Sequence, residues 1–317
     1  MSASGERRAI VLDCDPGLDD AMAILTAARY AQLVAITTVN GNVSLDKTTR
    51  NALVTAQLAG LDVPVHAGAA RPLLAEPLDA ARVHGESGLD GPVLPALERE
   101  PASHDAVGFL LELTRRRGDI DLVAVGPLTN VALAMRADAG FASRLRSLTI
   151  MGGGVNMGNV TPVAEFNVWA DPEAAAVVLA SGIEVTMVGL NLTTQVRAGR
   201  RTVDELRAAA TPTSVFAADL LAFYRAAVLE MGSAHGGSLH DPCAVLAVTH
   251  LHLFGLRDRW VAVELTGTHT RGMTVVDERG HHDGPAPNAK VAYDVDAAEA
   301  MALIVAASID PHGGAAA

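Results

Sequence analysis

The sequence predicts an α/β fold in which one mostly parallel central sheet is flanked by helices, with a small antiparallel strand pair near the C-terminus. Short, nearly continuous apolar segments alternate with longer helical patterns, and turns rich in glycine or acids stand where the apolar segments end. The 317 residues suffice for one large domain, and neither a linker nor an internal repeat divides them. We therefore expect a single domain over 1–317, with flexible tails at 1–7 and 311–317.

The first five elements follow regular patterns. Residues 9–15 are nearly all apolar until the final acids, as expected of a strand buried on both faces. Residues 19–31 begin with two aspartates, which favour a helix N-terminus, and 33–39 is the next apolar strand. Residues 44–60 are expected to form a helix, because a serine stands at the N-cap position and a glycine at the end. The third strand is expected at 63–68.

The middle of the chain begins with a passage rich in glycine and proline, residues 71–95. It is too long for a simple connection, so we expect functional or irregular surface there. The alternation then resumes with a helix near 104–117, a strand at 120–126, a helix from about residue 128 and a strand at 148–154.

The last third of the chain is mainly helical. Its helices are expected at 171–182, across 202–231, at 240–250 and after Asp296. One more strand is expected at 183–191. Residues 260–267 and 272–280 have the pattern of a hairpin-like strand pair.

The composition limits the classes of partner. The formal net charge is −12 and only two residues are lysines, so a nucleic-acid backbone is not expected, whereas a small neutral substrate or a cation fits. No uninterrupted apolar run reaches the roughly 18 residues of a spanning helix, and the start does not resemble a signal peptide. We therefore expect no membrane partner and a cytoplasmic location. Cys14 and Cys243 are expected to be reduced thiols.

The stretch DCDPGLDD (13–20) holds four carboxylates within eight residues, where the first apolar strand ends. In open α/β sheets, ligands bind beyond the carboxyl ends of strands, which places Asp15, Asp19 and Asp20 at that rim. Three close carboxylates repel one another, so either water solvates them or a cation neutralises them. Oxygen ligands suit Ca²⁺ or Mg²⁺ rather than zinc. An EF-hand is excluded, because the twelfth position counted from Asp13 is Ile24 instead of glutamate.

Three other stretches place polar groups at strand ends or helix starts. AVGPLTN (124–130) ends a strand in a Gly-Pro turn with free carbonyls, and MGGGVNMGNVTPVAEFN (151–167) puts glycines, amides and one acid beyond another strand. The glycine spacing in the latter does not match a dinucleotide fingerprint. SLHDPCAV (238–245) puts His240 and Asp241 at a helix start. Each stretch alone is also typical of a plain turn or cap.

Together these stretches resemble the nucleoside hydrolases of the inosine-uridine-preferring type. DCDPGLDDAMAI resembles the N-terminal signature of that family, and the similarity covers nearly the whole chain. It continues in order through AITTVNGN (35–42), HGESGLDGP (84–92), VGPLTNVALA (125–134), IMGGG (150–154), AEFNVWADPEAA (164–175) and HDPCAV (240–245). The resemblance implies a Rossmann-like nucleoside hydrolase fold, and hydrolysis of the N-glycosidic bond of purine or pyrimidine ribonucleosides to ribose and free base.

The resemblance also implies a tightly held Ca²⁺ and assigns residues to roles. By motif match, the implied metal ligands are Asp15, Asp20, the backbone carbonyl of Val125, and Asp241. Implied ribose contacts are Asp19 and Asn42 near the 2′-hydroxyl, Met151 below the ring, and Asn159, Glu165 and Asn167 on the 5′-hydroxyl side. Asp15 is the implied general base for a metal-bound water, and His240 the implied acid for the leaving base. The transition state would resemble an oxocarbenium ion.

The base preference stays open. The resemblance implies that His84 contributes to base selection, together with the segment before His240. That segment has Tyr224 as its only tyrosine and lacks the further tyrosine and glutamine of some pyrimidine-preferring relatives. His235 stands there instead and is expected at the surface. We expect Asp13 to hold loop backbone or metal ligands rather than substrate.

Two other functions compete with this one. A metal-dependent phosphatase with an aspartate nucleophile also carries paired aspartates after a first strand, but Pro16 stands where such enzymes need threonine or valine. Such enzymes also need a lysine near the phosphoryl group, and the only lysines here are Lys47, in an expected helix, and Lys290, near the end of the chain. A non-catalytic Ca²⁺-dependent protein that binds a nucleoside or ribose could use the same cradle. The presence of both Asp15 and His240 argues against it. The resemblance also implies a homo-oligomer, either a dimer or a tetramer.

Overall fold

The computed structural model describes residues 7–230, 237–279 and 284–313. Most of the two predicted tails, and His235, lie outside these residues. Within them, eight strands form one sheet in the order β3-β2-β1-β4-β5-β6-β12-β9. The strands are β1 (Ala9–Cys14), β2 (Gln32–Thr38), β3 (Val65–Ala67), β4 (Ile120–Ala124), β5 (Ser147–Met151), β6 (Val185–Val188), β9 (Phe254–Arg259) and β12 (Ala289–Val295). All neighbours pair in parallel except β12 with β9, which confirms the predicted mostly parallel sheet.

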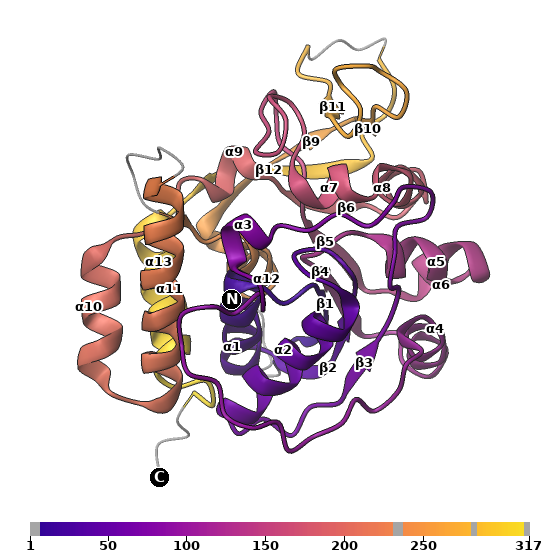
Figure 1. The fold of residues 1–317 in the computed structure, drawn as a ribbon. Coiled ribbons are helices and arrows are strands. Elements are labelled where there is room, and N and C mark those ends of the chain that lie inside the picture. The colour runs from indigo at the N-terminus through magenta and orange to yellow at the C-terminus, as the bar shows by residue number, and fades with distance from the viewer. Residues whose placement is uncertain (1–6, 231–236, 280–283, 314–317) are drawn as a thin grey trace.

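Helices cover both faces of the sheet (Figure 1). Along β1, Ile10 and Leu12 are buried in one core and Ala9 and Val11 in the other, as alternation along a strand requires. The first core also contains residues of α1 (Leu18–Tyr30), α2 (Leu45–Leu58), α10 (Arg200–Ala209), α11 (Pro212–Glu230), α12 (Asp241–Thr249) and α13 (Ala297–Ile309). The second contains residues of α4 (Ala106–Arg116), α5 (Thr129–Ala137), α6 (Phe141–Arg144) and α8 (Pro172–Leu179). The chain is a single α/β domain.

Helix α11 is long and apolar enough to cross a membrane, judged by length and composition alone. Asp219 and Arg225 interrupt its apolar sequence, and one side of the helix, with Phe216, Leu220 and Leu221, is buried in the first core. This burial is the ordinary environment of a core helix, so α11 leaves the expectation of no membrane partner as it was.

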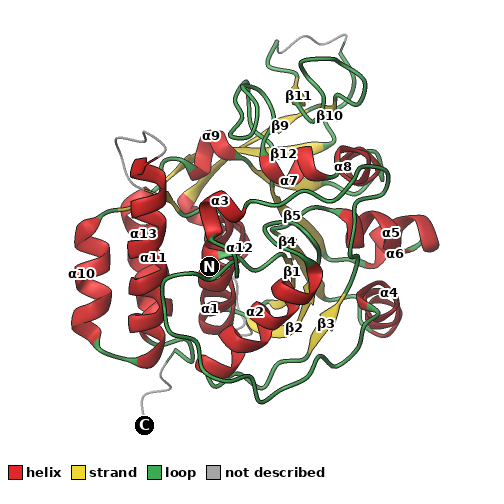
Figure 2. Cartoon of the chain, in the orientation of Figure 1, coloured by secondary structure: helices red, strands yellow, loops and turns green. Residues whose placement is uncertain are grey.

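Shorter elements complete the fold (Figure 2). They are α3 (Ala81–His84), α7 (Phe166–Ala170), α9 (Leu190–Thr193), the 3₁₀ turn Leu251–Leu253, the pair β7 (Arg197–Ala198) and β8 (Gly237–Ser238), and the hairpin strands β10 (Val261–Val263) and β11 (Thr274–Val276). The antiparallel pairing of β10 with β11 confirms the predicted strand pair. The expected irregular passage at 71–95 is also confirmed, with α3 as its one helical turn among the described residues.

Several boundaries differ from the sequence-based expectations. The expected strand 183–191 ends at Val188, because the chain turns at Gly189 into α9. The expected helix 202–231 is two helices, separated at Ala210, whose φ of 54° is left-handed. Strands β9 and β12 were not predicted. β12 has a usable signal, since apolar side chains recur at every second position from Ala289, whereas β9 is an edge strand with three consecutive charged residues, which protect such edges.

The strand order reverses at β1, since β2 and β3 lie on one side of it and β4, β5 and β6 on the other. Such a reversal leaves a crevice beyond the carboxyl ends of the two strands at the switch point, here β1 and β4. Asp15 follows β1 and Val125 follows β4, and the two ends are joined where the Val125 N–H donates to the carbonyl of Asp13 at 2.8 Å. The topology therefore places the acidic loop and the Gly-Pro turn on the same rim.

The opposite end of β4 holds a buried ion-pair cluster. Asp121 is fully buried and accepts hydrogen bonds from Arg8, Arg146 and Ser147. Burial alone would raise the pKa of Asp121, but the bonds to Arg146 and Arg8 hold it below its ordinary value. The cluster therefore stabilises the sheet at the N-terminal end of β4, remote from the carboxyl strand ends that carry the acidic loop.

Replacing Asp121 by alanine is expected to lower the free energy of unfolding by about 3 kcal/mol, the lower end for breaking a buried pair, because both arginines are partly exposed. Asp119→Ala is the matched control: its pair with Arg117 is exposed, so less than about 1 kcal/mol is expected. Urea unfolding measures both variants. Equal losses would show that the Asp121 cluster does not stabilise this end of the sheet.

Candidate active site

A cavity of about 290 Å³ opens at the switch point. Ten of the twelve residues singled out from the sequence line it: Asp19, Asn42, His84, Val125, Met151, Asn159, Glu165, Asn167, His240 and Asp241. The other two, Asp15 and Asp20, are buried immediately behind the lining, where both contact Asn42. Residues from six separate stretches of sequence thus meet in one place.

The acidic loop is shaped by its own carboxylates. Asp20, in the first turn of α1, accepts hydrogen bonds from the backbone N–H groups of Asp15 and Gly17, both at 3.0 Å. A side chain at position 17 has no room, because a Cβ there would lie 2.4 Å from Nδ1 of His84. The Asn42 side chain donates to the Asp15 carbonyl and to Asp20, each at 3.1 Å. These bonds fix the loop between β1 and α1 as a rigid turn.

Asp15 has two oxygens in different situations. Oδ2 accepts a hydrogen bond from the backbone N–H of Asn42 at 2.7 Å. Oδ1 is buried and has no hydrogen-bond partner among the described residues. Two glycines leave space for this carboxylate: a Cβ at Gly41 would lie 2.1 Å from Oδ2, and one at Gly126 would lie 2.5 Å from Oδ1. A buried carboxylate oxygen without a donor is costly, so Oδ1 has a free acceptor site for a ligand.

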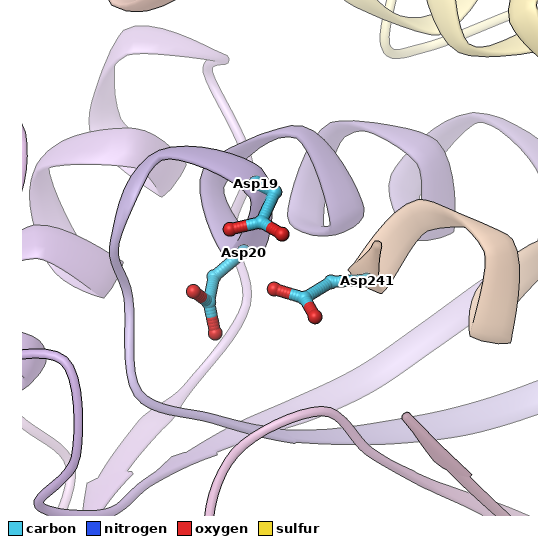
Figure 3. Close-up of side chains that lie close together, drawn as sticks. All are labelled: Asp19, Asp20 and Asp241. Carbon is cyan, nitrogen blue, oxygen red and sulfur yellow. The ribbon is translucent and has the colours of Figure 1, made fainter. Parts of the chain in front are cut away.

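Asp19, Asp20 and Asp241 form a buried acidic cluster, whose ligand oxygens lie within 4.8 Å of one another. Figure 3 shows the two aspartates of α1 and Asp241, at the start of α12, pointing toward a common space. Burial, together with the negative charge of Asp19, raises the pKa of Asp20 to about 7. Burial and the charges of Asp19, Asp20 and Asp15 raise the pKa of Asp241. Burial and the charge of Asp20 raise the pKa of Asp15. The cluster is therefore uncompensated and needs protons or a cation.

The donor set fits a hard divalent cation. All of its donors are oxygens, the ligands preferred by Ca²⁺ and Mg²⁺. They are the carboxylates of Asp19, Asp20 and Asp241, the free Oδ1 of Asp15 and the carbonyl of Val125. Asn167 already donates to the Val125 carbonyl at 2.7 Å, which leaves that oxygen its second lone pair. The cluster of Asp19, Asp20 and Asp241 differs from the carboxylate ligands implied by the resemblance. It contains Asp19, which was expected to contact ribose, in place of Asp15.

Another part of the cavity lining is organised by Glu165, the N-cap of α7. Its carboxylate accepts hydrogen bonds from the backbone N–H groups of Gly153 at 2.8 Å, Asn167 at 3.0 Å and Val168 at 3.3 Å. Burial raises the pKa of Glu165 to about 7 despite these donors. Asn159 accepts from the backbone N–H of Phe166 at 2.9 Å. These contacts fix the carboxylate of Glu165 and the amide of Asn159, which both line the cavity.

Two histidines in the lining have defined surroundings. Nδ1 of His84 accepts a hydrogen bond from the backbone N–H of Leu18 at 3.1 Å, which leaves the ring proton on Nε2. Nδ1 of His240 lies 2.7 Å from the Thr193 hydroxyl. Burial lowers the pKa of both rings, and the charge of Asp19 partly offsets this. Both histidines are consequently held neutral near pH 7.

Asp13 lies under the site instead of in it. Its Oδ1 accepts hydrogen bonds from the Thr37 hydroxyl at 2.5 Å and from Asn130 at 2.8 Å. Burial raises the pKa of Asp13 to about 6, and these two bonds oppose the shift. Asn130 also donates to the Thr38 carbonyl and accepts from the Ala69 N–H. Asp13 thus contacts side chains of β2 and α5, whereas the sequence led us to expect contacts with loop backbone or metal ligands.

The apolar part of the lining was not predicted. It comprises Ala80, Val83, Val160, Phe166, Val228 and the buried Tyr224, the last noted only as the one tyrosine of its segment. Apolar side chains in a pocket wall have the same sequence pattern as core residues. No signal in the sequence separates them.

Comparison with known proteins gives consistent results. Residues 10–302 match the family model described as inosine-uridine preferring nucleoside hydrolase. The pyrimidine-specific ribonucleoside hydrolase RihA of Shewanella sp. (strain ANA-3) is 41% identical over 303 residues, covering 94% of this chain and 95% of that protein. RihA of Salmonella arizonae is 43% identical over 292 residues, covering 90% and 94%.

Two solved structures are similar over nearly the full chain. The plant nucleoside hydrolase PpNRh1 superposes with a TM-score of 0.88 at 32% identity, covering 95% of this chain and 99% of that one. The purine-preferring ribonucleoside hydrolase from Gardnerella vaginalis superposes with a TM-score of 0.90 at 29% identity, covering 96% and 99%. The fold and the sequence therefore point to the same group of proteins.

Proposed function

The chain belongs to the inosine-uridine preferring nucleoside hydrolase family, and from this premise we propose that it is a Ca²⁺-dependent hydrolase selective for pyrimidine ribonucleosides. The products would be ribose and the free base. One observation carries the proposal: Asp19 and Asp241 line a cavity at the switch point, and Asp20 and the free, buried Oδ1 of Asp15 lie behind that lining. A Ca²⁺-dependent binding protein could use the same carboxylates as metal ligands, so the choice of hydrolysis over binding rests on the family to which the chain belongs and on the presence of His240 in the cavity lining.

We assign the metal to Asp15, Asp20, the Val125 carbonyl and Asp241, with Asp19 at the edge of the site toward the ribose. Oxygen ligands alone, six to eight in number, are the preference of Ca²⁺, and ribose hydroxyls would supplement the protein oxygens. When bound, the cation would neutralise the carboxylates, orient the ribose hydroxyls and lower the pKa of a water.

Asp15 is the proposed general base. Its Oδ2 is held by Asn42 at 2.7 Å, so the free Oδ1 is aimed without rotation of the side chain and can take a proton from the attacking water. General acid or base help of this kind is worth about 10²–10⁴-fold in rate. As the glycosidic bond breaks, positive charge develops on the ribosyl ring, and the surrounding carboxylates stabilise that charge.

The ribose is proposed to lie between the acidic cluster and the part of the lining around Glu165. Asp19 and Asn42 would contact the 2′-hydroxyl side, and Met151 would lie below the ring. Asn159, Glu165 and Asn167 would contact the 5′-hydroxyl, and all three line the cavity. Positioning of this kind lowers the entropy cost of reaching the transition state.

His240 is proposed to deliver a proton to the leaving base. Burial lowers its pKa, so a protonated imidazolium is available mainly below neutral pH. The Thr193 hydroxyl at Nδ1 fixes the orientation of the ring, and the charge of Asp19 is the neighbour that favours the protonated form. The protonated form of His240 is thus least populated at the higher pH values that favour ionised Asp15.

The preference for pyrimidines is supported by the names of the RihA relatives, which are more similar in sequence than the purine-preferring structure. His84 does not discriminate between the base classes. The Leu18 N–H fixes Nδ1 as acceptor, so Nε2–H is a donor in the lining. Pyrimidine O2 and purine N3 are both acceptors beside the glycosidic nitrogen, so the proposed preference rests on the relatives.

Ribose release from uridine, cytidine, inosine, adenosine and guanosine tests the proposed function. We expect uridine and cytidine to have kcat/KM values at least about 10-fold above those of the purine nucleosides, and all release to stop after chelation and return with Ca²⁺. Higher values for the purine nucleosides would reverse the proposed base preference. No release from any of the five with Ca²⁺ present would overturn the activity and favour a binding protein.

A cytoplasmic location and assembly into a dimer or tetramer stay predictions. Light scattering on the protein as it elutes from a size-exclusion column would give its mass and so the number of subunits.

A further inference from the structure

The hairpin of β10 and β11 contacts residues 153–173, which we call the ribose-side segment because it contains Asn159, Glu165 and Asn167. Two of these contacts come from consecutive hairpin residues. Arg271 forms an ion pair with Glu173 at 2.8 Å. Gly272 has a φ of 82°, and a Cβ there would lie 3.0 Å from Cα of Trp169. The hairpin backbone therefore lies directly against α7.

The next two hairpin residues continue the contact. Met273 forms an isolated antiparallel bridge with Ala164. The Thr274 hydroxyl donates to the carbonyl of Gly154 at 2.7 Å and accepts from the N–H of the same glycine at 2.9 Å. Four residues in a row thus hold the ribose-side segment at four points, and Thr274 fixes both polar groups of one residue.

The bond at Gly154 is one residue from the site. The N–H of the preceding Gly153 donates to Glu165 at 2.8 Å. Gly153 has a φ of 70°, and a Cβ there would lie 2.5 Å from Cγ2 of Thr274. Thr274 itself is only 2% exposed and does not line the cavity. It is therefore placed to set the position of Glu165 without touching substrate.

We propose that the β10–β11 hairpin braces the ribose-side segment and that Thr274 is the positioning residue for recognition of the 5′-hydroxyl. The inference rests on the proposed function, because its readout is nucleoside hydrolysis. Thr274 fixes the turn at Gly153 and Gly154, and this turn fixes the carboxylate of Glu165. A small misplacement of a substrate contact is costly in rate even when its origin is remote from the reacting atoms.

Thr274→Val keeps the shape of the side chain and removes the hydroxyl. We expect kcat/KM for uridine to fall about 10-fold, mainly through KM. For 5′-deoxyuridine, which lacks the group that Glu165 would contact, we expect variant and parent to agree within about 2-fold. Thr274→Ser restores the hydroxyl and should recover most of the uridine activity. Thr268→Val makes the same change at an exposed position of the hairpin and should have no effect.

A second variant keeps the test decisive if Thr274→Val does not fold. Arg271→Gln weakens the partly exposed ion pair with Glu173 and should reduce uridine hydrolysis more than 5′-deoxyuridine hydrolysis. Equal losses on both substrates, or no loss in either variant, would overturn the inference. A parent protein that cleaves neither uridine nor 5′-deoxyuridine would instead overturn the proposed function, and this inference with it.

Discussion

Replacing Asp15 by asparagine is expected to lower kcat for uridine by about 10²–10⁴-fold, the range for loss of general-base catalysis. The asparagine oxygen can still accept the hydrogen bond that Asn42 donates to Oδ2. Its amide nitrogen then stands where the unpartnered Oδ1 was, and an amide nitrogen cannot take a proton from water. Steady-state kinetics at saturating uridine and Ca²⁺ measure the effect, and metal content shows how much of it reflects lost cation.

Asp13→Asn is the matched control for this variant. Asp13 is two residues before Asp15, at the end of β1, is also buried, and also has one oxygen without a partner among the described residues. Its other oxygen accepts from Thr37 and Asn130, which an asparagine oxygen can continue to do. We expect its loss in kcat to stay below about 10-fold. Asp15→Asn with parental kcat and parental metal content would show that Asp15 is not the base.

Local patterns in the sequence were sufficient to place the acidic loop at the end of a strand. β1 ends at Cys14, so Asp15 follows at its carboxyl end, and strand ends of a parallel sheet converge. The helix-start position of Asp241 is also typical of a plain cap, so its place in the site was implied only by the resemblance to the family. The sequence could not predict that Asp19, instead of Asp15, forms the cluster with Asp20 and Asp241. This depends on the directions of side chains in the loop and in the first turn of α1.

Contacts between distant segments were beyond the sequence patterns. Thr274 lies 120 residues from Gly154, and no periodicity relates the two. β12 was missed although its alternation is visible in the sequence. Its place beside β6 and β9, in contrast, depends on strand order, which pairing energies over the whole sheet decide. Phe166 and Val160 were missed because an apolar wall and an apolar core look alike in sequence.

Removing the metal is expected to destabilise the protein increasingly as the pH rises. Without a cation, burial and the charge of Asp19 raise the pKa of Asp20 to about 7, far above the unfolded value of 3.8, and the pKa values of Asp15 and Asp241 shift in the same direction. The folded chain then binds protons that the unfolded chain releases. The free energy of unfolding of the metal-free protein must therefore fall as the pH rises from about 4 to 7.

Bound Ca²⁺ replaces those protons, so its stabilising effect should be largest above pH 7. At 100 times Kd a ligand contributes about 2.7 kcal/mol, a shift in Tm on the order of 5 °C for a chain of this size. We expect this shift at pH 8 and a much smaller one at pH 5.5, measured by thermal unfolding with and without chelator. Asp241→Asn, which leaves the bonds of Asp20 to the loop intact, should abolish it. Equal shifts at both pH values, or an unchanged shift in Asp241→Asn, would mean that the acidic cluster is not where the cation binds.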